Sequence, residues 1–95
     1  MLLLPAELTV HEATACLQML RQGLRAQARE GAGTVVADAS ALVRFDSSAL
    51  ALLLECRREA QTLGKGFAVQ GLPERLRALA GLYGVGELLP AVAGH

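Results

Sequence analysis

The stretch Val43-Arg44-Phe45-Asp46-Ser47-Ser48-Ala49-Leu50-Ala51-Leu52-Leu53-Leu54 decides the fold. Its polar triplet, residues 46–48, opens an apolar run that continues with helical spacing to about Leu63 and stops at Gly64. Before it, Thr34–Asp38 is short, apolar and rich in β-branched residues, which is typical of a buried central strand. The triplet is therefore predicted to lie where a strand crosses to a helix. At such a helix N-terminus the backbone N–H groups are unpaired and the dipole is positive.

Working outward, helices alternate with strands along the whole chain. Thr9 and Glu12 form a capping-box pattern that predicts a first helix over Val10–Arg29. Pro73 followed by an acid predicts the start of a third helix. The remaining strands are predicted at Leu2–Leu4 and Phe67–Gln70, with a last strand or turn over 87–89 and a loose tail over 90–95.

This alternation predicts an α/β fold in one domain, residues 1–95. We expect a small, mixed, mostly parallel sheet of four or so strands, with three to four helices mainly on one face. The N-terminal strand is expected to add antiparallel. The N-terminal apolar segment is too short and too interrupted by Pro5 and Glu7 to be a signal peptide. No run approaches the ~20 apolar residues of a membrane span, so a cytoplasmic protein is expected.

Helical spacing separates expected core faces from expected surfaces. On the second helix Leu50 and Leu54 fall outside the core stripe, beside Arg57. Apolar side chains mixed with Arg are enriched in protein interfaces, although a solvated helix face is the alternative. The predicted core positions are Val10, Ala13, Leu17, Leu20, Leu24 and Ala28 on the first helix; Ala49, Leu52, Leu53, Cys56, Ala60 and Leu63 on the second; and Leu72, Leu76, Leu79 and Tyr83 on the third.

Composition argues against several classes of function. The formal net charge is zero and aromatic residues make up 3% of the chain, so neither a basic patch nor a stacking platform for nucleic acid is expected. Cys16 and Cys56 stand alone within helical patterns and are expected to be buried, reduced thiols. His11 and His95 are isolated, so no metal site is expected, and no cofactor motif occurs.

Ser47 and Ser48 are the candidate functional hydroxyls. Asp46 or Ser47 is expected to cap the second helix, but a cap alone requires only one polar residue. A hydroxyl at a helix N-terminus also suits a docking site or a phosphorylation switch, and Asp38 and Asp46 lie nearby in the sequence. No G-x-S-x-G, Walker or G-x-G-x-x-G pattern occurs, so no enzyme is expected.

The sequence resembles the STAS domains, the fold of the anti-sigma factor antagonists. The likeness rests on Thr34-Val35-Val36-Ala37-Asp38, on Phe45-Asp46-Ser47-Ser48-Ala49-Leu50-Ala51-Leu52-Leu53, and on Gly64, Phe67–Gln70 and Gly71-Leu72-Pro73. Two segments, Leu4-Pro5-Ala6-Glu7-Leu8-Thr9 and Leu79-Ala80-Gly81-Leu82-Tyr83-Gly84-Val85, are more similar to the MlaB-type branch. Ala49 replaces the usual Gly, which favours the helix by about 1 kcal/mol and adds a methyl group beside the hydroxyls.

The resemblance implies a non-enzymatic accessory subunit that binds and stabilises the ATPase of a phospholipid ABC transporter and supports outer-membrane lipid asymmetry. Contact with the membrane would be indirect, peripheral at the inner membrane. The partner-binding residues would be Arg44, Asp46, Ser47, Leu50, Leu54 and Arg57, supported by Asp38. The alternative is an anti-sigma factor antagonist that binds an anti-sigma factor kinase, with Ser47 or Ser48 as the phosphoacceptor. A lipid- or nucleotide-binding domain acting alone is a third option.

Overall fold

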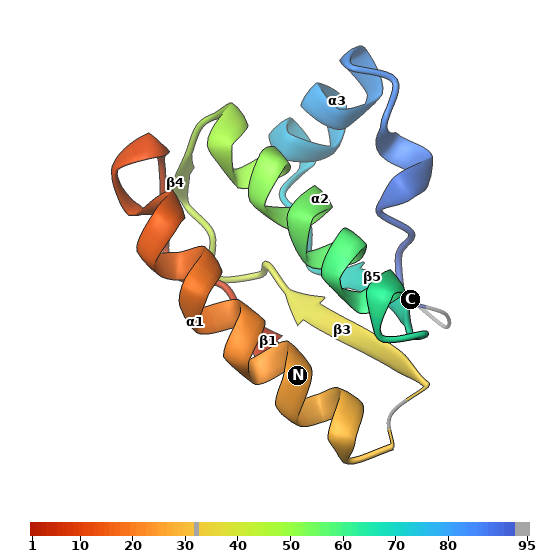
Figure 1. Cartoon of the computed structure of the whole chain (residues 1–95). Helices are drawn as coiled ribbons and strands as arrows, with labels where there is room; N and C mark the ends of the chain where they lie inside the picture. The colour runs from red at the N-terminus through yellow and green to blue at the C-terminus, as the bar shows by residue number, and fades with distance from the viewer. Residues whose placement is uncertain (32, 93–95) are drawn as a thin grey trace.

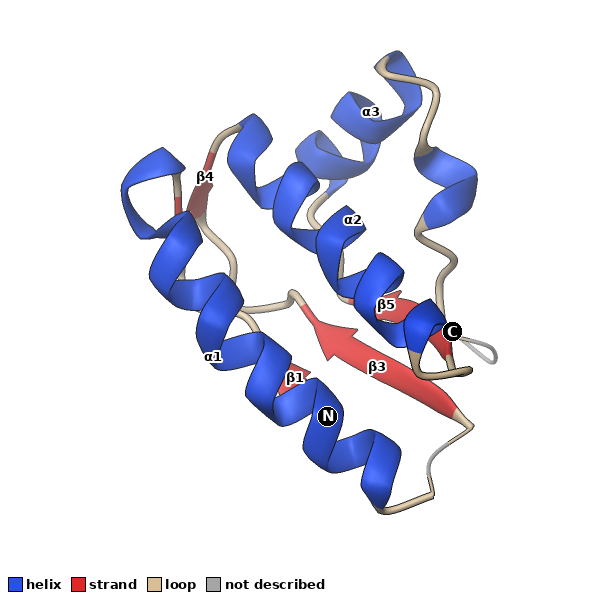
Figure 2. Cartoon of the chain, viewed as in Figure 1, coloured by secondary structure: helices blue, strands red, loops and turns tan. Residues whose placement is uncertain are grey.

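A computed structural model describes residues 1–31 and 33–92. Three helices alternate with short strands (Figures 1 and 2). In chain order the elements are β1 (Leu2–Leu3), β2 (Glu7–Leu8), α1 (Val10–Arg29), β3 (Thr34–Asp38), β4 (Arg44–Phe45), α2 (Ser47–Thr62), β5 (Gly66–Gln70), α3 (Glu74–Leu82) and the 3-10 turn η1 (Gly86–Leu88).

The strands form two parallel sheets. The main sheet has the order β1-β3-β5, and β2 pairs with β4 beside it. Because β1 runs parallel to β3, with Leu2 opposite Ala37, the expectation of an antiparallel first strand is wrong. A strand of two residues carries no side-chain pattern that could reveal its direction. The α/β class and the mostly parallel sheet are confirmed.

The core lies between the main sheet and the α1–α2 layer. Val35 and Ala37 of β3 are fully buried, whereas the alternating Val36 and Asp38 are only partly covered. Figure 1 shows α1 and α2 crossing the same face of the sheet, with α3 beside α2. The covered face thus takes every second strand residue, and the prediction of helices mainly on one face is confirmed.

Three predicted core positions lie instead at helix ends that project past their neighbours. Val10 is 64% exposed, Tyr83 is 58% exposed and Leu63 is 40% exposed. Val10 is the first residue of α1, and the other two are the C-cap residues of α3 and α2. Helical spacing gives the direction of a side chain but not where the packed neighbour ends, so these assignments are wrong. Cys16 and Cys56 are both buried free thiols, as predicted.

The segment after α3 is tied to the sheet. Residues 86–88 form the turn η1 rather than a strand. The Val69 N–H donates to the Pro90 carbonyl at 2.9 Å, and Ala91 forms a parallel bridge to Val69. The expected loose tail is therefore wrong at residues 90 and 91, because the free edge of β5 offers them hydrogen-bond partners. Residues 93–95, including His95, lie outside the described residues. In the described part of the chain, no helix combines the length and apolar character needed to cross a membrane.

Candidate functional site

Asp46 joins the starts of two helices. As the N-cap of α2 it accepts a hydrogen bond from the Ser48 N–H at 2.8 Å through Oδ1. Its Oδ2 accepts from the backbone N–H of Val10, the first residue of α1, at 3.2 Å. These donors, the Ser48 N–H first, hold the pKa of Asp46 below its usual value. The predicted cap at this position is confirmed, and the carboxylate also fixes α2 relative to α1.

Ser47 is the first residue of α2 and is exposed, while Ser48 is partly buried. One turn later the outward position belongs to Ala51, which is also exposed. Leu50 is only 3% exposed and belongs to the core, so its placement on a partner-binding surface is wrong. The error arises because α2 contacts the sheet, α1 and α3, and its buried face is therefore wider than a single stripe.

An apolar groove lies between α1 and α2 beside the two serines. Its volume is about 190 Å³. Small side chains open it, because Ala13 on α1 and Ala51 on α2 leave room that larger residues would fill. The lining residues are Ala13, Thr14, Leu17, Ser48, Ala51, Leu52 and Glu55. We call Ser47, Ser48, Ala51, Thr14 and Leu17 the docking surface.

Further along the same two helices, two ion pairs join α1 to α2. Arg21 lies 3.6 Å from Glu55, and Arg25 donates to Glu59 at 2.8 Å. Both pairs are partly exposed, so each contributes little to stability.

The other predicted partner-binding residues lie around this surface rather than within it. Leu54 is partly buried against the core, and Arg57 donates to Gln61 at 3.3 Å. Arg44 is exposed and lies 3.5 Å from Glu7. Thr14, Leu17 and Ala51 line the groove but were not among the predicted site residues. The signal that could have revealed it was the pair of alanines, Ala13 and Ala51, on two helices that must pack together.

Asp38 does not contact the triplet by any hydrogen bond among the described residues. Its Oδ1 accepts from the hydroxyl of Ser40 at 2.6 Å and from the Ser40 N–H at 2.9 Å. These bonds, the hydroxyl first, lower the pKa of Asp38. The predicted supporting residue therefore organises the turn after β3.

The two cysteine thiols near α2 are not activated as nucleophiles. Burial raises the pKa of Cys56 to about 12 and also raises that of Cys16, so neither thiol forms a nucleophilic thiolate at neutral pH. Within the described ranges, no group of three His, Cys, Asp or Glu side chains could hold a metal ion. What remains is an exposed hydroxyl beside an apolar groove, on a rigid pair of helices.

Comparison with known protein families shows to which family the chain belongs. The family model described as "Mlab, STAS domain" matches residues 5–90. No curated protein matches the sequence. The chain belongs to the MlaB-type STAS family, whose domains are generally non-enzymatic accessory or regulatory modules that act through contacts with other proteins.

Proposed function

We propose that this MlaB-type STAS domain is an accessory subunit of an ABC-type phospholipid transporter and binds the transporter's ATPase through the docking surface. It acts on the cytoplasmic side of the inner membrane, reaches the membrane only through its partner, and supports outer-membrane lipid asymmetry. One observation carries the proposal: Ser48 lines the groove between α1 and α2, and the exposed Ser47 precedes it at the start of α2.

The geometry supports docking because the surface combines features that favour a protein partner. The groove is small, apolar and positioned by packed helices, so a partner side chain can enter it without reordering the chain. The hydroxyls at its rim supply hydrogen bonds that give direction. Ala51 leaves space for a partner helix to approach α2 closely.

The alternative is an anti-sigma factor antagonist switched by phosphorylation of Ser47, and the exposure of this hydroxyl favours it. The neighbouring carboxylates work against internal ordering by a phosphate. Asp46 already accepts backbone N–H groups from both helix starts, and Glu12 binds the Thr9 N–H at 2.8 Å. A phosphate on Ser47 would therefore act by repelling a partner.

The test is co-purification with partners from the native host. Ser47→Arg and Ala51→Arg each place a long charged side chain on the docking surface, and we expect both variants to fold and to lose the ATPase. The matched control is Gln22→Arg, an exposed position on α1 that does not line the groove; it should retain the ATPase.

Circular dichroism and thermal melting establish that each variant is folded. A folded Ser47→Arg or Ala51→Arg variant that retains the ATPase would contradict the proposal. Recovery of a sigma-regulating kinase in place of transporter subunits, lost on Ser47→Asp, would establish the alternative.

A further inference from the structure

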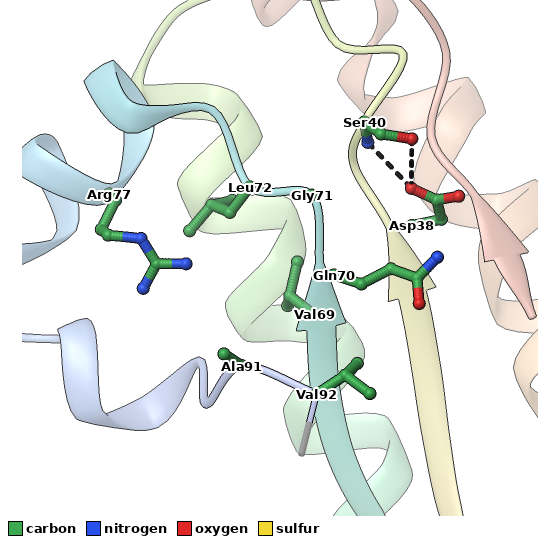
Figure 3. A pocket seen from close by; sticks show the side chains of 9 residues that line it. All are labelled: Asp38, Ser40, Val69, Gln70, Gly71, Leu72, Arg77, Ala91 and Val92. Carbon is green, nitrogen blue, oxygen red and sulfur yellow. Dashed lines mark hydrogen bonds between the residues drawn. The ribbon is translucent and has the colours of Figure 1, made fainter. Parts of the chain in front are cut away.

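A second hollow lies at the carboxyl ends of β3 and β5, in front of α3 (Figure 3). Its volume is about 330 Å³, within the range of small-molecule sites. The hollow lies where both strands end and the chain turns away from the sheet. It shares no lining residue with the groove between α1 and α2.

The walls of this hollow differ in charge. Figure 3 shows Arg77 on one side and Asp38 with Ser40 on the other. Between them lies an apolar floor that includes Val69, Leu72 and Ala91. A guanidinium binds a phosphate or carboxylate through parallel hydrogen bonds, whereas a carboxylate accepts from an ammonium group. The hollow is thus complementary to a molecule that carries both charges.

The carboxylate wall is held in place by the fold. Gly71 has φ +67°, and a Cβ there would lie 2.6 Å from the Cβ of Ser40, so the two turns that form this wall meet without space for a side chain. Ser40 donates twice to Asp38 Oδ1, and the Gln70 side chain lies beside the same carboxylate (Figure 3). The ordinary pKa of an aspartate, 3.8, already lies well below neutral and the Ser40 hydroxyl lowers that of Asp38 further, so the carboxylate is ionised at neutral pH.

The apolar floor of the hollow is also fixed by backbone hydrogen bonding. The Pro90 carbonyl accepts from the Val69 N–H, and this bond anchors Ala91 beside β5. Leu72 leads directly into α3, the helix that carries Arg77. The two charged walls therefore stand at the end of the central strand β3 and on the helix α3 rather than on a long loop.

We propose that this hollow binds a small zwitterion, with its anionic group against Arg77, its primary ammonium group against Asp38 and a short aliphatic stem over the apolar floor. The same chemistry occurs in free solutes and in the ethanolamine phosphate headgroup of a lipid. The site is independent of the docking surface and of the function proposed for it.

The binding test is amide chemical-shift titration of the isotope-labelled full chain. O-phosphoethanolamine, glycerophosphoethanolamine and γ-aminobutyrate should shift the amides of Ser40 and Gly71 at millimolar concentration. Ethanolamine lacks the anion and phosphocholine lacks an N–H donor, so both should bind more weakly. The absence of shifts with all three zwitterions would overturn the proposal.

Two variants test whether Arg77 and Asp38 bind the two charged groups of the ligand. Arg77→Gln and Asp38→Asn should each weaken binding about tenfold, the effect of losing one charge-assisted hydrogen bond. The exposed Arg29→Gln and Glu30→Gln at the end of α1 are matched controls and should bind normally. If Asp38→Asn lowers the melting temperature, Arg77→Gln decides alone. Shifts that persist unchanged in Arg77→Gln would refute the site.

Vesicles distinguish the two sources of the ligand. Co-sedimentation with phosphatidylethanolamine vesicles, but not with phosphatidylglycerol vesicles, would support a lipid headgroup as the ligand. Binding of the soluble zwitterions without co-sedimentation would support a free solute. Arg77→Gln should still co-purify with the ATPase, so failure of this site and failure of the docking proposal are separable.

Discussion

The starts of α1 and α2 lie next to each other but are stabilised in different ways. The start of α1 is capped by its own residues: Thr9 accepts from the His11 N–H, and Glu12 accepts from the Thr9 N–H. The start of α2 depends on Asp46, which also accepts from the Val10 N–H of α1. One cap is local, whereas the other connects two helices that are far apart in the sequence.

The difference shows how the docking surface is positioned. A local cap fixes only where its own helix begins. Asp46 fixes where α2 begins and also how that start lies relative to α1, and Ser47 is the next residue. The position of the serines relative to α1 is thus set in part by one carboxylate, which predicts unequal effects when the two caps are removed.

The largest effect is expected for Asp46→Ala. Loss of the cap and of the bond to α1 should lower the free energy of unfolding by more than the loss of an N-cap alone. Hydrogen exchange should accelerate at the Val10 and the Ser48 amides together. Asp46→Ser is the control, because its single hydroxyl can cap α2 but is too short to bridge to α1, and its effect should be intermediate. Equal stability of Asp46→Ser and Asp46→Ala would remove the distinction between the two roles.

Thr9→Ala should have a smaller effect of about 1 kcal/mol, the usual loss for an N-cap residue. Faster exchange should be confined to the first turn of α1, since no hydrogen bond of Thr9 reaches α2. Co-purification with the ATPase should be retained. Urea denaturation gives the stability, and accelerated exchange at Ser48 in this variant would show that the two caps are not separate.

Acid should gradually weaken the cap that Asp46 provides to α2 and its bond to α1. The pKa of Asp46 is lowered from 3.8, so its stabilising contribution is present above that value and is lost as the pH falls through the lower pKa of the folded protein. The difference in stability between the wild type and Asp46→Asn should therefore be full at neutral pH and shrink below about pH 4. Urea denaturation across this range measures it. A difference that stays constant in acid would mean that the charge of Asp46 contributes nothing.

Much of the fold could be predicted because its signals are local. The capping box and the glycine-containing turn gave both ends of α1 correctly, and the β-branched run gave β3. Signals that depend on distant packing were misread. The direction of β1 depends on pairing with β3, and the burial of Leu50 depends on three neighbours of α2.

The candidate site shows the same limit. Its polar part, Asp46 and Ser47, is contiguous in the sequence and was predicted as a functional element. Its apolar part is shared between Leu17 and Ala51, which no local pattern connects. The second bond of Asp46 to Val10 likewise could not be inferred, because the sequence does not state how close two helix starts will lie.

The parallel sheet has a consequence for the rate at which a partner can associate. Since α1 and α2 each follow a strand of the parallel pair β2–β4, these two helices begin side by side, where their positive dipole ends lie together. Each of the two starts carries one carboxylate, Glu12 on α1 and Asp46 at α2, which offsets that field. A partner then meets a nearly neutral surface, without long-range steering. Stopped-flow association should give a rate constant of about 10⁵–10⁶ M⁻¹s⁻¹ that changes little with salt.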